Sequence, residues 1–300
     1  MMIGRKRLGL GLALLAIMMT PLTAWAFLVN EWDPLQVIGV GKKAPEQAIP
    51  GKPWHEPVSG MDFLWMPGGC FKMGSPPSIE GREDDETPLH QVCVTGYWIG
   101  VHEVTQGQWR RIMRNNPARF KKGDAYPVER VAWEDTETFL GKLNLRYPGQ
   151  FAFRLPTEAE WEFACRDRGE RVRYAGGSDL DRGSWHRGNS GDTTQRTQSR
   201  RPTRMGLFDM SGNVWEWTHD AYQMQSYRRL GRDNPTLNIS SPYRVIRGGG
   251  FGSQGNTLRC ANRGFELFST KRSDLGLRLV RAYNRAYSSE PPSREEFLKY

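Results

Sequence analysis

Large apolar residues recur at helical intervals in one early stretch of the chain. Thr105 and Gln108 have the spacing of a capping box, in which each side chain bonds the backbone of the other residue. Trp109, Ile112 and Met113 follow at helical spacing. We therefore expect a helix that begins just after Thr105.

Two further stretches also have helical spacing. Residues 134–145 place three large apolar residues on one face, namely Phe139, Leu140 and Leu143. The other stretch begins at a second capping box, from Thr157 to Glu160, directly after a proline. Its helix would bury Trp161, Ala164 and Cys165. Arg154 and Glu160 would form a structural ion pair beside it.

Short apolar runs bounded by turn residues predict strands at residues 63–66, 214–217, 243–246 and 275–280. In the last run, leucines occupy every second position. In the second, Trp215 and Trp217 would share one face of the strand, and Glu216 would point to the other.

The chain becomes loop-rich between residues 167 and 204. In a compact domain, loops of this length are functional or are held by a disulfide or a bound ion. Together these patterns predict an α+β fold, a single loop-rich mixed domain with two or three helices and little regular secondary structure.

The first 26 residues have the order of an export signal. Basic residues at positions 5–7 precede a short apolar run, and Ala24-Trp25-Ala26 has the pattern of a cleavage site. A membrane anchor is the alternative, but the apolar run is short for a span of roughly 20 residues. We expect cleavage after Ala26, an exported chain that is periplasmic or secreted, and no stable membrane span afterwards.

The charge pattern argues against a nucleic-acid partner. The net charge is +9, and removal of residues 1–26, with three basic and no acidic residues, would leave +6. The basic residues are dispersed, and the pairs Arg200-Arg201 and Arg228-Arg229 are better explained as solvated surface.

All four cysteines lie beyond residue 26: Cys70, Cys93, Cys165 and Cys260. An even count in an exported chain permits two disulfides, but four cysteines allow three pairings, and spacing does not choose between them. No CxxC motif or Cys/His cluster is present, so we do not expect a zinc site.

Residues 80–86 carry five acidic residues: Glu80, Glu83, Asp84, Asp85 and Glu86. A solvated acidic loop is the favoured interpretation of this segment. A metal site is the alternative.

Several motifs occur in a fixed order along the chain. They are RLPTEAEWEFACR at 154–166, GLFDMSGNVWEW at 206–217, RGGGF at 247–251, LRCANR at 258–263 and DLGLRL at 274–279. PGGCFKMGS and YWIGVHEVTQGQW precede them. Together these segments closely resemble the formylglycine-generating enzyme family, also called the sulfatase-modifying factor domain. The resemblance implies a single mixed domain that is distantly like C-type lectins.

The resemblance covers residues 61–283. With the expected export signal, we expect four parts: a signal peptide at 1–26, an extended lead-in at 27–60, the family domain at 61–283 and a C-terminal tail at 284–300. The resemblance also implies a disulfide between Cys165 and Cys260, which leaves Cys70 to pair with Cys93. Each bridge typically contributes about 2–4 kcal/mol.

The resemblance further implies a structural calcium ion at the turn before the WEW strand. Its ligands would be the side chains of Asp209 and Glu216 and the carbonyls of Gly212 and Val214. Calcium prefers six to eight oxygen ligands, which such a set helps to supply. The alternative is a plain Gly-Asn turn with an exposed glutamate. A second site, in a loop shorter than that of relatives, would use Asn189, with Asp192 as a further candidate ligand.

One expected feature is missing from the sequence. Formylglycine generators use two cysteines that bind copper in the segment after RGG, but residues 247–259 contain no cysteine. Cys260 matches the structural cysteine of the family. Since soft thiolates are the natural copper(I) ligands, we expect no copper and no formylglycine formation by that route.

Three functions remain open for such a chain. The first is a cysteine-independent, oxidoreductase-like enzyme that tailors a secreted or periplasmic molecule, as a siderophore-maturing relative does. The second is a non-catalytic module that binds a peptide or glycan. The third is an accessory subunit of an envelope complex. The expected partner is therefore a secreted peptide, a siderophore-like molecule or a protein.

Candidate catalytic residues lie near the segment from which the cysteines are missing. Trp215 matches a tryptophan near the family's reactive centre, and Ser253 lies within the replaced segment. Arg263 and Glu266 follow it, with Glu266 the best candidate for a general base. The alternative for Glu266 is a surface carboxylate paired with Arg263.

Overall fold

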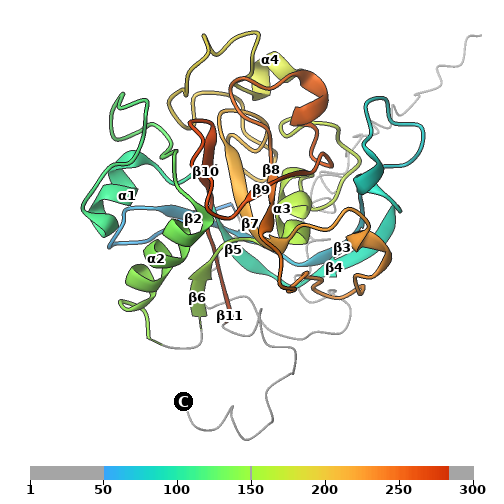
Figure 1. The fold of residues 1–300 in the computed structure, drawn as a ribbon, viewed down its shortest axis with the longest axis horizontal. Coiled ribbons are helices and arrows are strands. Elements are labelled where there is room, and N and C mark those ends of the chain that lie inside the picture. Colours follow the sequence, from blue (N-terminus) through green and yellow to red (C-terminus); the bar gives the residue numbers. More distant parts are fainter. Residues whose placement is uncertain (1–50, 149–150, 284–300) are drawn as a thin grey trace, which may run out of the picture. The chain divides into compact units, whose positions relative to one another are not determined.

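The computed structural model describes residues 51–148 and 151–283 (Figure 1). The expected signal peptide, most of the expected lead-in and the tail at 284–300 lie outside these residues. Within the described ranges, no helix is both long and apolar enough to cross a bilayer.

In the described residues, one antiparallel sheet, one mixed sheet and one hairpin form the framework. The first sheet has the strand order β1 (Trp54–His55), β2 (Asp62–Met66), β5 (Tyr97–Gly100), β11 (Val280–Tyr283) and β6 (Phe151–Arg154). The second has the order β10 (Leu275–Leu277), β7 (Trp215–Ala221), β8 (Tyr243–Arg247) and β9 (Gly264–Leu267). The hairpin joins β3 (Gly69–Met73) to β4 (His90–Val94). Strand β1, within the expected lead-in, is therefore part of the first sheet.

The three predicted helices are present, together with one short helix and three 3-10 turns. The helices are α1 (Gln106–Met113), α2 (Trp133–Asn144), α3 (Glu158–Cys165) and α4 (Leu180–Gly183), and the turns are η1 (Asp84–Glu86), η2 (Ser226–Arg228) and η3 (Gly255–Leu258). Both predicted capping boxes form. Thr105 and Gln108 exchange hydrogen bonds at the start of α1, and Thr157 and Glu160 do so at the start of α3.

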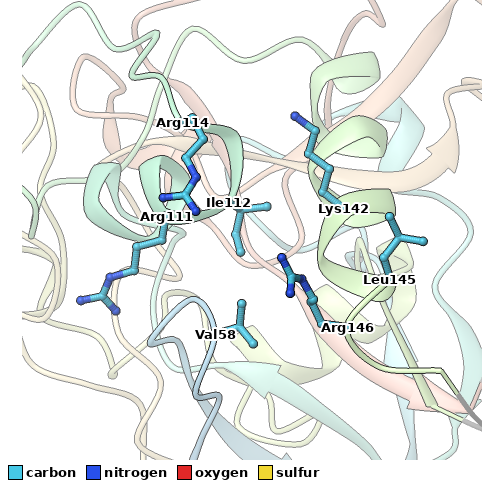
Figure 2. A pocket seen from close by; sticks show the side chains of 7 residues that line it. All are labelled: Val58, Arg111, Ile112, Arg114, Lys142, Leu145 and Arg146. Atoms are coloured by element: carbon cyan, nitrogen blue, oxygen red, sulfur yellow. The ribbon is translucent and has the colours of Figure 1, made fainter.

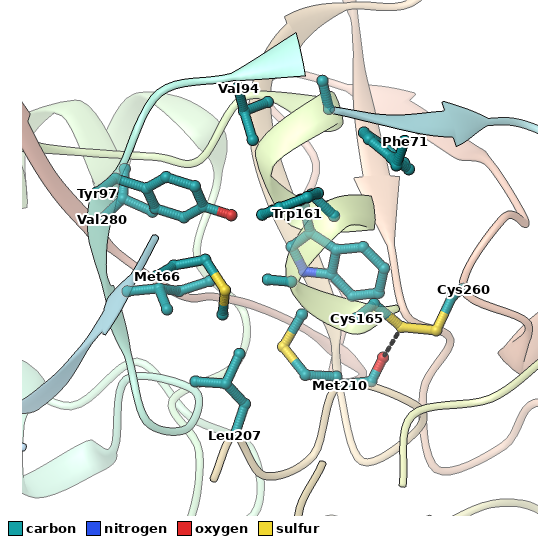
Figure 3. Packing of buried hydrophobic residues seen from close by; sticks show 14 of the residues in the cluster. Met66, Phe71, Val94, Tyr97, Trp161, Cys165, Leu207, Met210, Cys260 and Val280 are labelled. Carbon is teal, nitrogen blue, oxygen red and sulfur yellow. Dashed lines mark hydrogen bonds between the residues drawn. A yellow bond between two sulfur atoms is a disulfide. The ribbon is translucent and has the colours of Figure 1, made fainter. Parts of the chain in front are cut away.

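Helix α3 is buried along its whole length and lies in one of the two apolar cores. There Trp161 packs with Met210 and the Cys165–Cys260 disulfide (Figure 3). Arg154 donates two 2.6 Å hydrogen bonds to Glu160, which confirms the expected ion pair beside α3. The other core collects apolar residues of α1, α2 and β7.

The leucine run at 275–280 is not one strand, as the alternation predicted. Leu275–Leu277 pairs in parallel with β7, whereas Val280–Tyr283 joins the first sheet. The chain changes sheets at Arg278, whose buried guanidinium donates to Glu216 of β7 and to the carbonyl oxygen of Gly100 of β5. The buried arginine therefore links the two sheets at the point where the leucine pattern predicted a continuous strand.

Candidate functional site

An open groove of about 690 Å³ lies between the second sheet and the acidic segment at 82–85. Its walls come from parts of the chain that are far apart in sequence: β7, β8, β9, the turn η3 and the acidic segment. Trp215 and Arg263, two of the predicted site residues, line it. Tyr222, Phe265 and Asp85 line it as well, and the sequence had not singled them out as site residues.

One wall of the groove depends on close contact between β9 and Trp215. A Cβ atom added to Gly264 would lie 2.8 Å from the Trp215 ring and 2.9 Å from Ile246. Only glycine therefore lets β9 lie against the indole, which is itself 6% exposed. The predicted apolar wall at Trp215 is present, and Gly264 is the residue that allows it.

The acidic segment is solvated only in part, whereas a solvated loop was the favoured interpretation of its sequence. Glu80, Glu83 and Asp84 are exposed, but the last two acids are not. Glu86 is fully buried, and its carboxylate accepts hydrogen bonds of 2.7 and 2.6 Å from Arg259. Asp85 is 7% exposed. The buried arginine holds the segment against the sheet, and the segment thereby forms a wall of the groove.

Asp85 and Tyr222 form a hydrogen-bonded pair at this wall. The Tyr222 hydroxyl donates to Asp85 Oδ2 at 2.9 Å, while Asp85 Oδ1 is buried and has no hydrogen-bond partner among the described residues. Burial raises the pKa of Asp85, and Arg263 and the Tyr222 hydrogen bond offset part of that rise. A carboxyl group with a raised pKa that lines a cleft is a candidate for proton transfer.

Arg263 lines the groove, but its guanidinium group is already engaged. Nε and Nη2 donate to the two oxygens of buried Glu158 at 2.7 and 3.0 Å, and Nη1 donates to the Asp85 carbonyl oxygen at 2.9 Å. Glu158 itself has a lowered pKa, because Arg263 and Arg247 outweigh the effect of burial. Arg263 therefore positions Asp85 rather than offering a free cation to a ligand.

The mouth of the groove is aromatic and apolar. The Tyr222 ring stacks on Phe265 with centroids 4.1 Å apart, and Tyr243 meets Phe265 edge-on. Phe265 is 48% exposed and Met224 is 53% exposed. Exposed apolar side chains beside a cleft are typical of a ligand-binding surface.

The structure does not place Glu266 or Ser253 among the residues that line the groove. The Glu266 carboxylate accepts hydrogen bonds from the backbone N–H of Leu267, from Thr270 and from Arg272. Its ion-pair partner is thus Arg272 and not Arg263. The Ser253 hydroxyl accepts a hydrogen bond from the backbone N–H of Gly250 within its own turn.

Both implied disulfides are present. Cys165 bonds to Cys260 across 95 positions, and Cys70 bonds to Cys93 across the β3–β4 hairpin. Because the sequence has four cysteines, no thiol remains anywhere in the chain. Of the segment 247–259, from which the expected cysteines are missing, Thr257 lines the groove.

The predicted calcium ligands fit such an ion only in part. Asp209 is buried, and its Oδ1 has no hydrogen-bond partner among the described residues, as expected for an oxygen that could bind a cation. Gly212 lies with its Cα close to the Trp185 carbonyl oxygen, and an added Cβ would come within 2.2 Å of it. The structure thus keeps the tight turn that the predicted carbonyl ligands of Gly212 and Val214 require.

Glu216 does not fit the role of a calcium ligand in this arrangement. Its carboxylate accepts hydrogen bonds of 2.8–3.1 Å from Arg278 and one of 2.6 Å from Trp161. The strand does point Glu216 away from the two tryptophans, as the alternation predicted, but it meets an arginine there.

The second predicted calcium site also has other contacts. The Asn189 side-chain amide bonds within its own loop, to His186, Ser184 and Asp181. Across residues 51–148 and 151–283, no group of three or more His, Cys, Asp or Glu side chains is arranged to hold a metal ion. A calcium ion bound through Asp209 stays a prediction, and its role there would be to crosslink the loops around the turn.

A family model described as "Sulfatase-modifying factor enzyme 1-like domain" matches residues 51–283. The chain belongs to the sulfatase-modifying factor family. The formylglycine-generating enzyme of Thermomonospora curvata is 31% identical to it, with 68% of this chain and 86% of that enzyme covered.

Other similar proteins differ in how much of their own length this chain covers. The serine/threonine-protein kinase Pkn1 of Chlamydia trachomatis is 30% identical over 67% of this chain, but the chain spans only 35% of that kinase. The solved structure of PvdO from Pseudomonas aeruginosa has a TM-score of 0.68, with 24% identity over 80% of this chain and 99% of PvdO. PvdO therefore has the same fold as this member of the sulfatase-modifying factor family.

Proposed function

We propose that this chain is a cysteine-independent member of the sulfatase-modifying factor family that modifies an exported molecule by proton transfer. The molecule would bind in the groove lined by Trp215, Tyr222 and Asp85, which is called the Trp215 groove below. The observation that carries the proposal is the Asp85–Tyr222 pair, a buried carboxyl group joined to a hydroxyl group that lines the groove. The two disulfides, which account for every cysteine, support an oxidising compartment.

The proposed step needs no redox partner. A ligand X–H group in the groove gives its proton to the Tyr222 oxygen while the Tyr222 proton moves to Asp85. The X–H bond breaks, an O–H bond forms on Asp85, and the negative charge moves from Asp85 to the ligand. The raised pKa of Asp85 favours its protonated product state.

The test deletes the gene in its own organism and then restores it as the wild-type chain or as a variant. Asp85→Asn keeps an oxygen that can accept the Tyr222 hydrogen bond but removes the basic carboxylate. Glu83→Gln, which changes another acid that lines the groove, is the matched control. Mass spectrometry of the extracytoplasmic fraction then compares small molecules and peptides among the strains.

We expect an unmodified precursor to accumulate in the deletion strain and with Asp85→Asn, and to disappear with the wild-type chain and Glu83→Gln. Full restoration by Asp85→Asn would reject the proton-transfer proposal.

A second candidate is a non-catalytic binding module. It is favoured by the exposed apolar side chains at the groove mouth, Phe265 and Met224. If Phe265→Ser abolishes function in the same strains while Asp85→Asn does not, the groove binds its ligand without proton transfer.

A further inference from the structure

A second groove, of about 450 Å³, lies between the C-terminal ends of α1 and α2 (Figure 2) and shares no lining residue with the groove at Trp215. Its lining consists of four basic and three apolar side chains: Arg111, Arg114, Lys142, Arg146, Val58, Ile112 and Leu145. No acidic side chain lines this groove. It is called the α1–α2 groove below.

Three of the four cations in the α1–α2 groove are unpaired. Arg111 donates to the Ser59 carbonyl oxygen at 2.9 Å, and Figure 2 shows it extending away from the other lining side chains. Within the described residues, the side chains of Arg114, Lys142 and Arg146 make no ion pair or hydrogen bond. All three are exposed.

Helix dipoles explain only part of this arrangement. Cations near the carboxyl end of a helix are favourable, typically by about 0.3–1 kcal/mol each. That effect accounts for basic residues at the ends of α1 and α2. It does not account for the exposed apolar side chains among them, since Leu145 is 81% exposed and Val58 is 39% exposed.

Uncompensated cations around a protruding leucine complement the chemistry of an anionic bilayer. The phosphate headgroups would meet the basic side chains, and Leu145 would enter the acyl boundary. An acidic peptide would also pair with the basic side chains, but that pairing gives no apolar environment to Leu145. The α1–α2 groove offers charge around a protruding leucine, which suits a lipid surface better than an acidic peptide.

We propose that the α1–α2 groove docks the chain onto a membrane surface rich in anionic phospholipid. Arg114, Lys142 and Arg146 bind the headgroups, and Leu145 inserts between them. The docking is peripheral and separate from the function proposed for the Trp215 groove. It would hold the protein at an extracytoplasmic membrane surface.

The test measures co-sedimentation of the purified full chain with two kinds of vesicle. One contains phosphatidylcholine alone, and the other contains phosphatidylcholine with phosphatidylglycerol. One variant combines Arg114→Gln, Lys142→Gln and Arg146→Gln, and a second carries Leu145→Ser. The matched control combines Arg171→Gln, Arg228→Gln and Arg229→Gln, which removes the same charge from exposed sites outside the groove. Every variant keeps the same N-terminal region, so any binding through residues 1–50 cancels in the comparison.

We expect the wild-type chain and the control to bind the anionic vesicles more tightly than the neutral ones, with a preference that falls as salt rises. The triple groove variant should lose at least tenfold of that binding, and Leu145→Ser should lose part of it. Equal binding by the groove variant and the control would overturn the proposal. So would a wild-type chain with no preference for anionic vesicles, or a groove variant that changes only the melting temperature, since the groove would then bind another part of the chain.

Discussion

The Tyr222 hydroxyl donates a 2.9 Å hydrogen bond to Asp85, although the two residues are 137 positions apart in the chain. One follows strand β7 and the other lies in the turn η1. Folding therefore brings together the carboxyl and hydroxyl groups to which we assign a function. No local sequence pattern predicts this pair.

Removal of the Tyr222 hydroxyl should raise the pKa of Asp85 further. The hydrogen bond lowers that pKa against the effect of burial, so Tyr222→Phe removes a stabilising partner of the charged form. Carbon-13 NMR titration of the aspartate side chains would measure the shift. Tyr243→Phe, which touches Phe265 but not Asp85, should leave the titration unchanged. An unchanged or lowered pKa in Tyr222→Phe would contradict this account.

Breaking the buried pair between Glu216 and Arg278 should be strongly destabilising. Neither side chain is exposed, so Arg278→Met leaves an uncompensated buried carboxylate. Such changes typically reduce the free energy of unfolding by about 3–5 kcal/mol. Urea denaturation would measure the loss. Arg204→Met, which breaks the exposed pair with Glu170, should cost less than about 1 kcal/mol and serves as the control. Similar losses in the two variants would be the contrary result.

The two disulfides should differ in their contribution to stability. The Cys165–Cys260 bridge closes a loop of 95 positions, and the Cys70–Cys93 bridge closes one of 23. The entropy of loop closure makes the longer bridge worth about 1 kcal/mol more. Burial of Cys165 and Cys260 adds to the difference, because the double alanine variant also leaves a cavity in the core. Urea midpoints of the two paired Cys→Ala variants would test this order, and the reverse order would refute it.

Glu129 should make the chain less stable as the pH rises from 4.5 to 7. Burial raises the pKa of Glu129 to about 7, so the folded chain keeps this proton in a range where the unfolded chain has lost it. The free energy of unfolding therefore falls across that range. Glu129→Gln removes this effect and should be more stable than wild type at pH 8, relative to pH 5, by on the order of 2 kcal/mol. Parallel stability curves for the two proteins between pH 5 and 8 would count against it.

Calcium should stabilise the fold through Asp209. The free Oδ1 of this buried side chain would gain a partner, and binding to the native state alone raises the melting temperature. We expect a higher melting temperature in excess calcium than in excess chelator, and no such difference in Asp209→Asn. Equal wild-type midpoints, with no calcium found by elemental analysis, would remove the site.

Local signals in the sequence located the helices well. The capping boxes at Thr105 and Thr157 involve residues three positions apart, so they can be identified without knowledge of the fold. Strand limits were less accurate at 275–280, because the alternation of leucines does not show that Arg278 is bound between two sheets. The resemblance to a family supplied the disulfide pairing, which spacing could not.

The groove was only partly predictable, because its residues are brought together by long-range pairing. The run of acids at 80–86 is typical of a solvated loop unless the position of Arg259, 173 residues beyond Glu86, is known. Glu266 had suitable chemistry, but its carboxylate accepts hydrogen bonds from Arg272 and Thr270, and it does not line the groove. Trp215, which lines the groove, could be singled out because it belongs to a long, ordered motif.

The groove surface and the ion pairs beneath it belong to separate layers. Glu158, Arg259 and Glu86 form the lower layer, and Phe265 and Met224 project from the surface above. Arg263 joins the two, since it lines the groove and binds Glu158. Amino-acid replacements at the surface positions would leave the buried pairs intact. Substitutions at the groove mouth would therefore alter what the groove contacts without altering the framework that shapes it.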